Sequence, residues 1–95
     1  MFKREVMKHI SIKISGKVQG VYFRASTKDV AEKFDIKGFV RNERDGSVYI
    51  EAEGEEENLK QFVAWCHHGP LLAEVQHVEL KEGIVQGFTR FEITR

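Results

Sequence analysis

Residues 16–24 combine the residue types and the spacing that a binding site for a phosphate-sized anion needs. They join a strand-like stretch to a helix-like stretch in the order Gly16-Lys17-Val18-Gln19-Gly20-Val21-Tyr22-Phe23-Arg24. The two glycines allow positive φ angles and let a ligand approach the backbone closely. N–H groups at the start of the following helix converge on one point, where the helix dipole also favours an anion. Arg24, in the first helical turn, can hold a phosphate through two parallel hydrogen bonds.

The glycine turn alone does not establish such a site, because β–α connections with a glycine and a surface arginine are common. The charge distribution adds weak support. Residues 1–50 contain eleven Lys and Arg against six Asp and Glu, a net charge of +5, whereas residues 51–95 contain four against nine, a net charge of −5. A basic N-terminal half suits an anionic ligand, but a nucleic-acid-binding protein usually has a larger excess.

Length and composition limit the class of protein. The 95 residues suffice for one two-layer core, so we expect a single domain over residues 1–95. No apolar run reaches the roughly 18–20 residues of a membrane span, and no signal-peptide pattern occurs near the start. The single cysteine, Cys66, excludes an internal disulfide and fits a reducing compartment. We therefore expect a cytoplasmic protein without membrane contacts.

Seven elements are expected to position the glycine turn. Alternating apolar residues over 8–15 predict a strand that turns Ile10, Ile12 and Ile14 inward and His9, Ser11 and Lys13 outward. The stretch 47–53 alternates likewise, with Ser47, Tyr49, Glu51 and Glu53 outward. The other elements are helices over 23–34 and from 55 to a stop at Gly69-Pro70, and strands over 36–42, 74–82 and 88–94. Val75 and Val78 are out of phase, which predicts a bulge near Gln76.

The expected order of elements is β α β β α β β. Helices with one apolar stripe and strands with one apolar face predict an α+β two-layer sandwich, with two helices on one face of a mainly antiparallel sheet. This is the ferredoxin-like βαββαβ arrangement with an extra C-terminal strand. The fold occurs in enzymes, RNA-binding modules and ligand sensors, so function must be argued from the site.

Two other groups of residues could suggest chemistry. Cys66, His67, His68 and His77 resemble a metal-binding cluster, but adjacent helical residues point about 100° apart. We therefore expect no metal site, and Cys66 lies on an apolar stripe where nothing would activate its thiol. The acidic residues between 51 and 57 are expected to form a solvated strand face and a helix start.

Two stretches closely resemble the acylphosphatase family. The first is Gly16-x-Val18-Gln19-Gly20-Val21-x-Phe23-Arg24, and the second is Gly38-Phe39-Val40-x-Asn42, followed by Gly46-x-Val48 and Gly54. Together they span about forty positions, and the expected order of elements covers the rest of the chain. By comparison with the family, residues 1–7 resemble an N-terminal extension before its usual start. A double match at this spacing is far more specific than the glycine turn alone.

The resemblance implies hydrolysis of acyl phosphates without a cofactor or metal. It places the phosphate-binding loop on Gly16, Val18, Gln19, Gly20, Val21, Tyr22 and Phe23. It makes Arg24 the residue that grips the phosphate and Asn42 the residue that orients the attacking water, with Thr27 as a supporting residue. Inorganic phosphate or sulfate would then compete with the substrate, and we expect a monomer.

A different class, the RNA-binding modules, shares this order of elements. Those modules need adjacent aromatic residues on the open sheet face. Here only Phe39 and Tyr49 are available, because the first strand offers Ser, Lys and His on that face. A regulatory ferredoxin-like domain without catalysis is the third possibility. Hydrolysis of an acyl phosphate would distinguish an enzyme from both.

Overall fold

The computed structural model describes residues 6–95. Its elements are β1 (Met7–Lys17), α1 (Phe23–Lys33), β2 (Lys37–Asn42), β3 (Val48–Glu55), α2 (Glu56–Cys66), β4 (Glu74–Gly83) and β5 (Phe91–Ile93). The predicted order of elements is therefore confirmed. The extension expected at residues 1–7 falls mostly outside the described residues, although Met7 already belongs to β1. No described helix has the length and apolar character needed to cross a bilayer.

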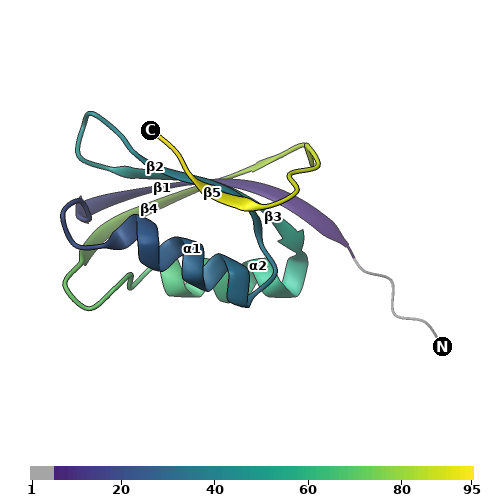
Figure 1. The fold of residues 1–95 in the computed structure, drawn as a ribbon, viewed down its shortest axis with the longest axis horizontal. Coiled ribbons are helices and arrows are strands. Elements are labelled where there is room, and N and C mark those ends of the chain that lie inside the picture. Colours follow the sequence, from purple (N-terminus) through teal and green to yellow (C-terminus); the bar gives the residue numbers. More distant parts are fainter. Residues whose placement is uncertain (1–5) are drawn as a thin grey trace.

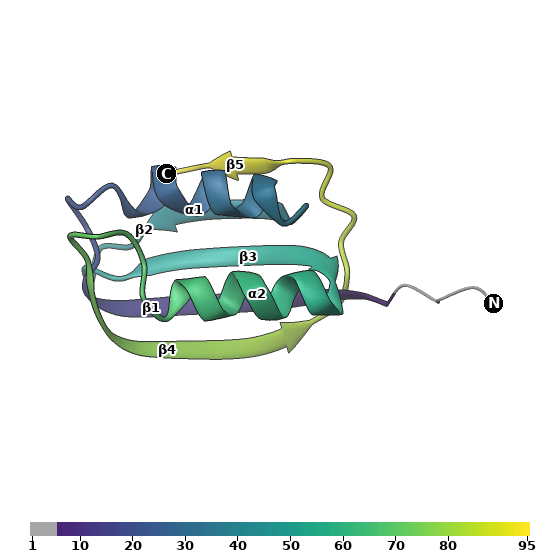
Figure 2. The ribbon, with the colours of Figure 1, turned by 90° about the horizontal axis from the view of Figure 1, so that it is seen from below.

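One five-stranded sheet, in the order β4-β1-β3-β2-β5, forms the upper layer of the molecule. Neighbouring strands are antiparallel except β2 and β5, which run parallel. Both helices cover the same face of the sheet (Figure 1). Viewed from the helical side, α1 lies along β2 and β5, and α2 lies along β1 and β3 (Figure 2). The predicted two-layer, mainly antiparallel sandwich is confirmed.

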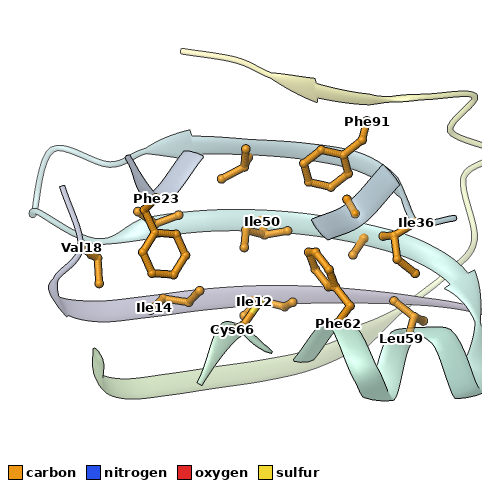
Figure 3. Close-up of a cluster of buried hydrophobic side chains, with 14 of the residues drawn as sticks. Ile12, Ile14, Val18, Phe23, Ile36, Ile50, Leu59, Phe62, Cys66 and Phe91 are labelled. Carbon is orange, nitrogen blue, oxygen red and sulfur yellow. The ribbon is translucent and has the colours of Figure 1, made fainter. Parts of the chain in front are cut away.

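The core lies between the sheet and the two helices. Ile12 and Ile14 of β1 are fully buried, and they pair with Ile50 and Val48 of β3. Figure 3 shows these strands and the helices contributing side chains to the same layer. Phe62 of α2 meets Phe91 of β5 with ring centroids 6.1 Å apart, so this contact ties the last strand to the helical layer. The alternation of apolar residues therefore determines which face of the sheet is buried.

The bulge predicted near Gln76 is present. Ser15 pairs with His77 and Gly16 pairs with Val75, so Gln76 is the extra residue on β4. Gly16 itself lies in β1 rather than in the turn where the sequence placed it. A methyl group on Gly16 would lie 2.2 Å from the carbonyl oxygen of Glu74. The close approach of β4 at the bulge therefore requires glycine at position 16.

The prediction that His9, Ser47 and Glu53 face solvent is wrong. Ser47 is buried with 3% exposure at the turn before β3. The exposed fractions of His9 and Glu53 are 3% and 2%, because the segment before β5 folds over the open face of the sheet at this point. The Glu53 carboxylate accepts hydrogen bonds from the backbone N–H groups of Gln86, Gly87 and Phe88, the last two at 2.9 and 3.0 Å. His9 Nδ1 lies 2.6 Å from Glu53 Oε2. This buried pair anchors the loop that leads into β5.

Most element boundaries differ from the prediction by one to three residues, and two of these differences have a clear structural reason. The last strand covers only Phe91–Ile93, because the Glu53 carboxylate engages the N–H of Phe88 instead of a strand partner. Gly54 does not end β3, which continues to Glu55. A methyl group on Gly54 would lie 2.6 Å from Cδ1 of Ile36. Gly54 therefore makes room for a core side chain.

Candidate active site

A cavity of about 480 Å³ opens where three segments of the chain meet. It is lined by Val18, Gly20, Tyr22, Phe23, Arg24, Ala25, Asn42 and Ile93. These residues come from the β1–α1 loop, the start of α1, and the ends of β2 and β5. Since β2 and β5 run parallel, both end at the edge of the sheet where the β1–α1 loop lies (Figure 2).

The β1–α1 loop has an unusual backbone. Gly20 has a φ of 74°, and a methyl group placed on it would meet no atom within 4 Å. Tyr22 also has a positive φ, 63°, although it is not glycine. A non-glycine residue in this region costs about 1–2 kcal/mol, and such residues concentrate at functional sites. The loop therefore exposes its backbone at Gly20 to open space, where a ligand can approach it.

The start of α1 is free to bind an anion. Tyr22 is the N-cap residue and provides no side-chain hydrogen bond to the helix, and the first turn contains no acidic residue. The first N–H groups of a helix lack partners within the helix, and the helix dipole makes this end positive. The fold thus directs N–H donors and a positive potential at the cavity.

Of the residues that the structure describes, Arg24 is the only charged one that lines the cavity. It lies in the first turn of α1 and is exposed. Among residues 6–95, no salt bridge involves Arg24. Its guanidinium is therefore available to a ligand, and its planar donors match the oxygens of a phosphate.

Asn42 reaches the cavity from the last position of β2, opposite Val48 of β3. The turn that follows is held tightly. Asp45 Oδ1 accepts hydrogen bonds from Ser47 N at 2.9 Å and Ser47 Oγ at 2.6 Å, and Lys13 Nζ lies 2.9 Å from Asp45 Oδ2. The hydrogen bonds from Ser47, followed by that from Lys13, hold the pKa of Asp45 well below its usual range. A fixed turn gives Asn42 a defined position.

Gln19 connects the glycine loop to the β2–β3 turn. Its side-chain nitrogen donates hydrogen bonds to the carbonyl oxygens of Glu43 and Ser47, at 2.8 and 2.9 Å. Gln19 does not line the cavity. Its side chain instead joins the loop that bears Gly20 to the turn that follows Asn42.

Three further residues assigned to the site by sequence also lie outside the cavity lining. Gly16 packs against β4, and Val21 is buried with 4% exposure. Thr27 is fully buried, and its hydroxyl donates a 2.7 Å hydrogen bond to the carbonyl oxygen of Phe23. Sequence reasoning missed Ala25 and Ile93. The position of Ala25 directly after Arg24 could have suggested that it belongs to the site. Ile93, in contrast, reaches the cavity only through the parallel pairing of β5 with β2.

The alternative metal cluster is not formed. Within residues 6–95, no group of three or more His, Cys, Asp and Glu side chains is arranged to hold a metal ion. Cys66 is fully buried, and burial raises the pKa of its thiol. The side chain of His77 is 65% exposed and lies on the opposite side of the sheet from the helix that carries Cys66.

Comparisons with known proteins agree on one family. The sequence matches the acylphosphatase family over residues 10–93. It is 41% identical over 90 residues to an acylphosphatase of Methylococcus capsulatus, covering 94% of this chain and 98% of that protein. It is 50% identical over 82 residues to an acylphosphatase of Marinobacter nauticus, covering 85% of this chain and 89% of that protein. The crystal structure of acylphosphatase from Bacillus subtilis superposes with a TM-score of 0.91 at 34% identity, covering 95% and 100% of the two chains.

The sheet order and the two helices on one face place the chain in the ferredoxin-like class of α+β proteins. Within that class, the chain belongs to the acylphosphatase family, and it is an enzyme.

Proposed function

We propose that this enzyme hydrolyses acyl phosphates to a carboxylate and inorganic phosphate, with Arg24 and the β1–α1 loop holding the phosphate and Asn42 orienting the water. The observation that carries the proposal is that Arg24, the uncapped start of α1 and Asn42 line one cavity. Positive charge and N–H donors at that point stabilise the negative charge that a phosphoryl group carries in the transition state. Gly16, Gln19, Val21 and Thr27 support the loop from outside the cavity.

The chemistry requires no general acid. The leaving group is a carboxylate whose conjugate acid has a pKa of about 4, near that of the acidic side chains, so it departs without a proton. Among residues 6–95, no carboxylate, imidazole, amine or thiol lines the cavity. We therefore assign the proton of the attacking water to an oxygen of the substrate's own phosphate. This assignment predicts a flat rate profile between about pH 5 and 8.

Asn42 suits the task of directing water toward phosphorus. Its amide can donate and accept hydrogen bonds while carrying no charge, so it is not repelled by the phosphate. Because the described residues that line the cavity include none of the carboxylate, imidazole and thiolate ligands that proteins use for metals, we propose that catalysis needs no metal ion. The single buried cysteine supports a reducing, cytoplasmic setting, and we propose a monomer.

The proposal is tested by hydrolysis of acetyl phosphate and benzoyl phosphate in excess EDTA, with inorganic phosphate as competitor. Turnover should persist in EDTA and be inhibited competitively by phosphate. Arg24→Ala should lower kcat/KM by at least about a hundredfold, while Arg90→Ala, at an exposed arginine outside the cavity, should not change it. Loss of turnover in EDTA that magnesium restores would refute metal independence. Full activity of Arg24→Ala would refute its role.

A further inference from the structure

The cavity exceeds the needs of a phosphate group. At about 480 Å³ it lies within the roughly 300–1,000 Å³ of pockets that hold drug-sized molecules. Arg24, Gly20 and Asn42 account for the phosphate and the water in the proposed function. The rest of the lining includes Tyr22, Ala25 and Ile93, whose side chains bring no charge.

We propose that Tyr22, Ala25 and Ile93 bind the acyl group of the substrate, and that they favour uncharged, apolar acyl groups over small or anionic ones. This inference rests on the proposed function, because it assigns the remainder of the same cavity. It names the substrate class as acyl phosphates with an aromatic or branched aliphatic acyl group.

Tyr22 provides the first support. Its side chain contributes little to the core, since 79% of the residue is exposed. It nevertheless occupies a position with a φ of 63°, where glycine or asparagine would be less strained. An exposed aromatic ring at the rim of the cavity offers a flat apolar surface, which a bound ligand would cover.

Ile93 provides the second support. It follows Phe91 by two residues in β5, so both side chains point toward the helical layer. Phe91 is buried with 3% exposure, but Ile93 remains 44% exposed where it lines the cavity. An apolar acyl group would remove this surface from water, whereas an acetyl group is too short to cover much of it.

The charges in the cavity exclude a preference for anionic acyl groups. In the part of the chain that the structure describes, Arg24 is the only charged residue of the lining, and the proposed function assigns it to the phosphate. A free carboxylate in the acyl group would find no other cation in the lining and would compete with the phosphate for Arg24. An apolar lining next to one arginine thus discriminates against acyl groups such as succinyl.

The experiment measures kcat/KM for acetyl, benzoyl and succinyl phosphate, together with the inhibition constant for inorganic phosphate. Wild type should favour benzoyl over acetyl phosphate, and succinyl phosphate should be no better than acetyl phosphate. Ile93→Ala should lower the ratio of benzoyl to acetyl kcat/KM about three- to tenfold, because apolar contacts in a half-open pocket fall at the low end of methylene discrimination. The phosphate inhibition constant should stay within about twofold, which shows that the Arg24 end of the cavity is intact.

Tyr22→Asn serves as a second variant, because asparagine tolerates the positive φ and replaces the aromatic ring with a small amide. Tyr22→Asn should also lower the ratio of benzoyl to acetyl kcat/KM. Ile84→Ala, at an isoleucine with 87% exposure outside the cavity, is the matched control and should leave the ratio unchanged. Ile93→Lys should raise succinyl relative to benzoyl phosphate by supplying the missing cation.

The outcomes separate this inference from the proposed function. If all three substrates are hydrolysed and neither Ile93→Ala nor Tyr22→Asn changes the benzoyl to acetyl ratio, the acyl-binding assignment is wrong while the hydrolase stands. If wild type hydrolyses none of the three, the proposed function fails and this inference fails with it. A wild-type preference for succinyl phosphate would overturn the predicted substrate class alone.

Discussion

The side-chain nitrogen of Gln19 lies 2.8 Å from the carbonyl oxygen of Glu43, the residue that follows Asn42. A second hydrogen bond, to the carbonyl oxygen of Ser47, closes the same connection from the other side of the β2–β3 turn. One side chain therefore sets the distance between the loop proposed to bind phosphate and the residue proposed to orient water. Such indirect positioning matters because small displacements of reacting groups reduce rates strongly.

Replacing Gln19 should reduce catalysis more than stability. Gln19→Met keeps the length of the side chain and removes both donors, so the carbonyl groups of Glu43 and Ser47 each keep only a backbone N–H partner, at a cost of about 1 kcal/mol in the free energy of unfolding. We expect kcat to fall about tenfold as Asn42 and the loop lose their fixed spacing. Steady-state kinetics and urea unfolding check both values. Gln61→Met, on the exposed face of α2, is the control, and wild-type kcat in Gln19→Met would exclude the positioning role.

Asn42→Ala should act on the chemical step. If Asn42 only orients water, kcat should fall about a hundredfold while KM changes little, because that interaction is made in the transition state. Asn42→Asp should in addition raise KM, since a carboxylate would face the phosphate. Asn58→Ala in α2 is the matched control. A large rise in KM for Asn42→Ala at constant kcat would instead assign Asn42 to substrate binding.

Two glycines of the first motif should respond differently to the same substitution. A methyl group at Gly16 collides with the backbone of β4, so Gly16→Ala should lower the free energy of unfolding by about 3 kcal/mol. A methyl group at Gly20 meets no protein atom within 4 Å, so Gly20→Ala should cost only the ~1–2 kcal/mol of its positive φ. Gly20→Ala should nevertheless lose most phosphate binding, measured as competitive inhibition. Tight phosphate binding by Gly20→Ala would contradict the proposed approach of the ligand at that backbone.

The buried Glu53 should make stability depend on acid pH. Desolvation raises the pKa of this carboxyl, but hydrogen bonds from Gln86 N–H, His9, Phe88 N–H and Gly87 N–H outweigh it, so the pKa lies below its ordinary value. The folded state therefore binds fewer protons than the unfolded state. The stabilisation is complete above the unfolded pKa of about 4.3 and is lost as the pH falls through the folded value.

Glu53→Gln should remove this dependence. Urea unfolding of wild type should show stability falling below about pH 5, and the curve for Glu53→Gln should be flatter and lower at neutral pH. Glu79→Gln, at an exposed carboxylate of β4, is the control and should follow wild type. Parallel pH curves for Glu53→Gln and wild type would mean that Glu53 does not carry the effect.

Local patterns predicted the elements well. Alternation over Ile10, Ile12 and Ile14 identified β1, and the conflict of phase between Val75 and Val78 identified the bulge at Gln76. Both signals lie within a few residues, where side-chain direction follows directly from backbone geometry.

Contacts between distant segments could not be predicted in the same way. His9 and Glu53 alternate with core residues, so the pattern assigned them to solvent. A loop more than thirty residues beyond Glu53 covers both side chains, and no local sequence pattern around them predicts this contact. Ile93 enters the cavity for a comparable reason, because a three-residue strand pairs in parallel with β2. Of the residues that line the cavity, the sequence therefore named Val18, Gly20, Tyr22, Phe23, Arg24 and Asn42, and it missed Ala25 and Ile93.

The sheet order also has a consequence for folding during synthesis. β1 is made first but lies between β3 and β4, and its pairing with β4 joins residues such as His9 and Gly83. One edge of β1 therefore stays unpaired on the ribosome until residues 74–83 have emerged. Long-range pairings of this kind slow folding and leave strand edges open to other chains in the meantime. The nascent chain should accordingly be most prone to associate with other chains during the interval after β3 has left the exit tunnel and before β4 has left it.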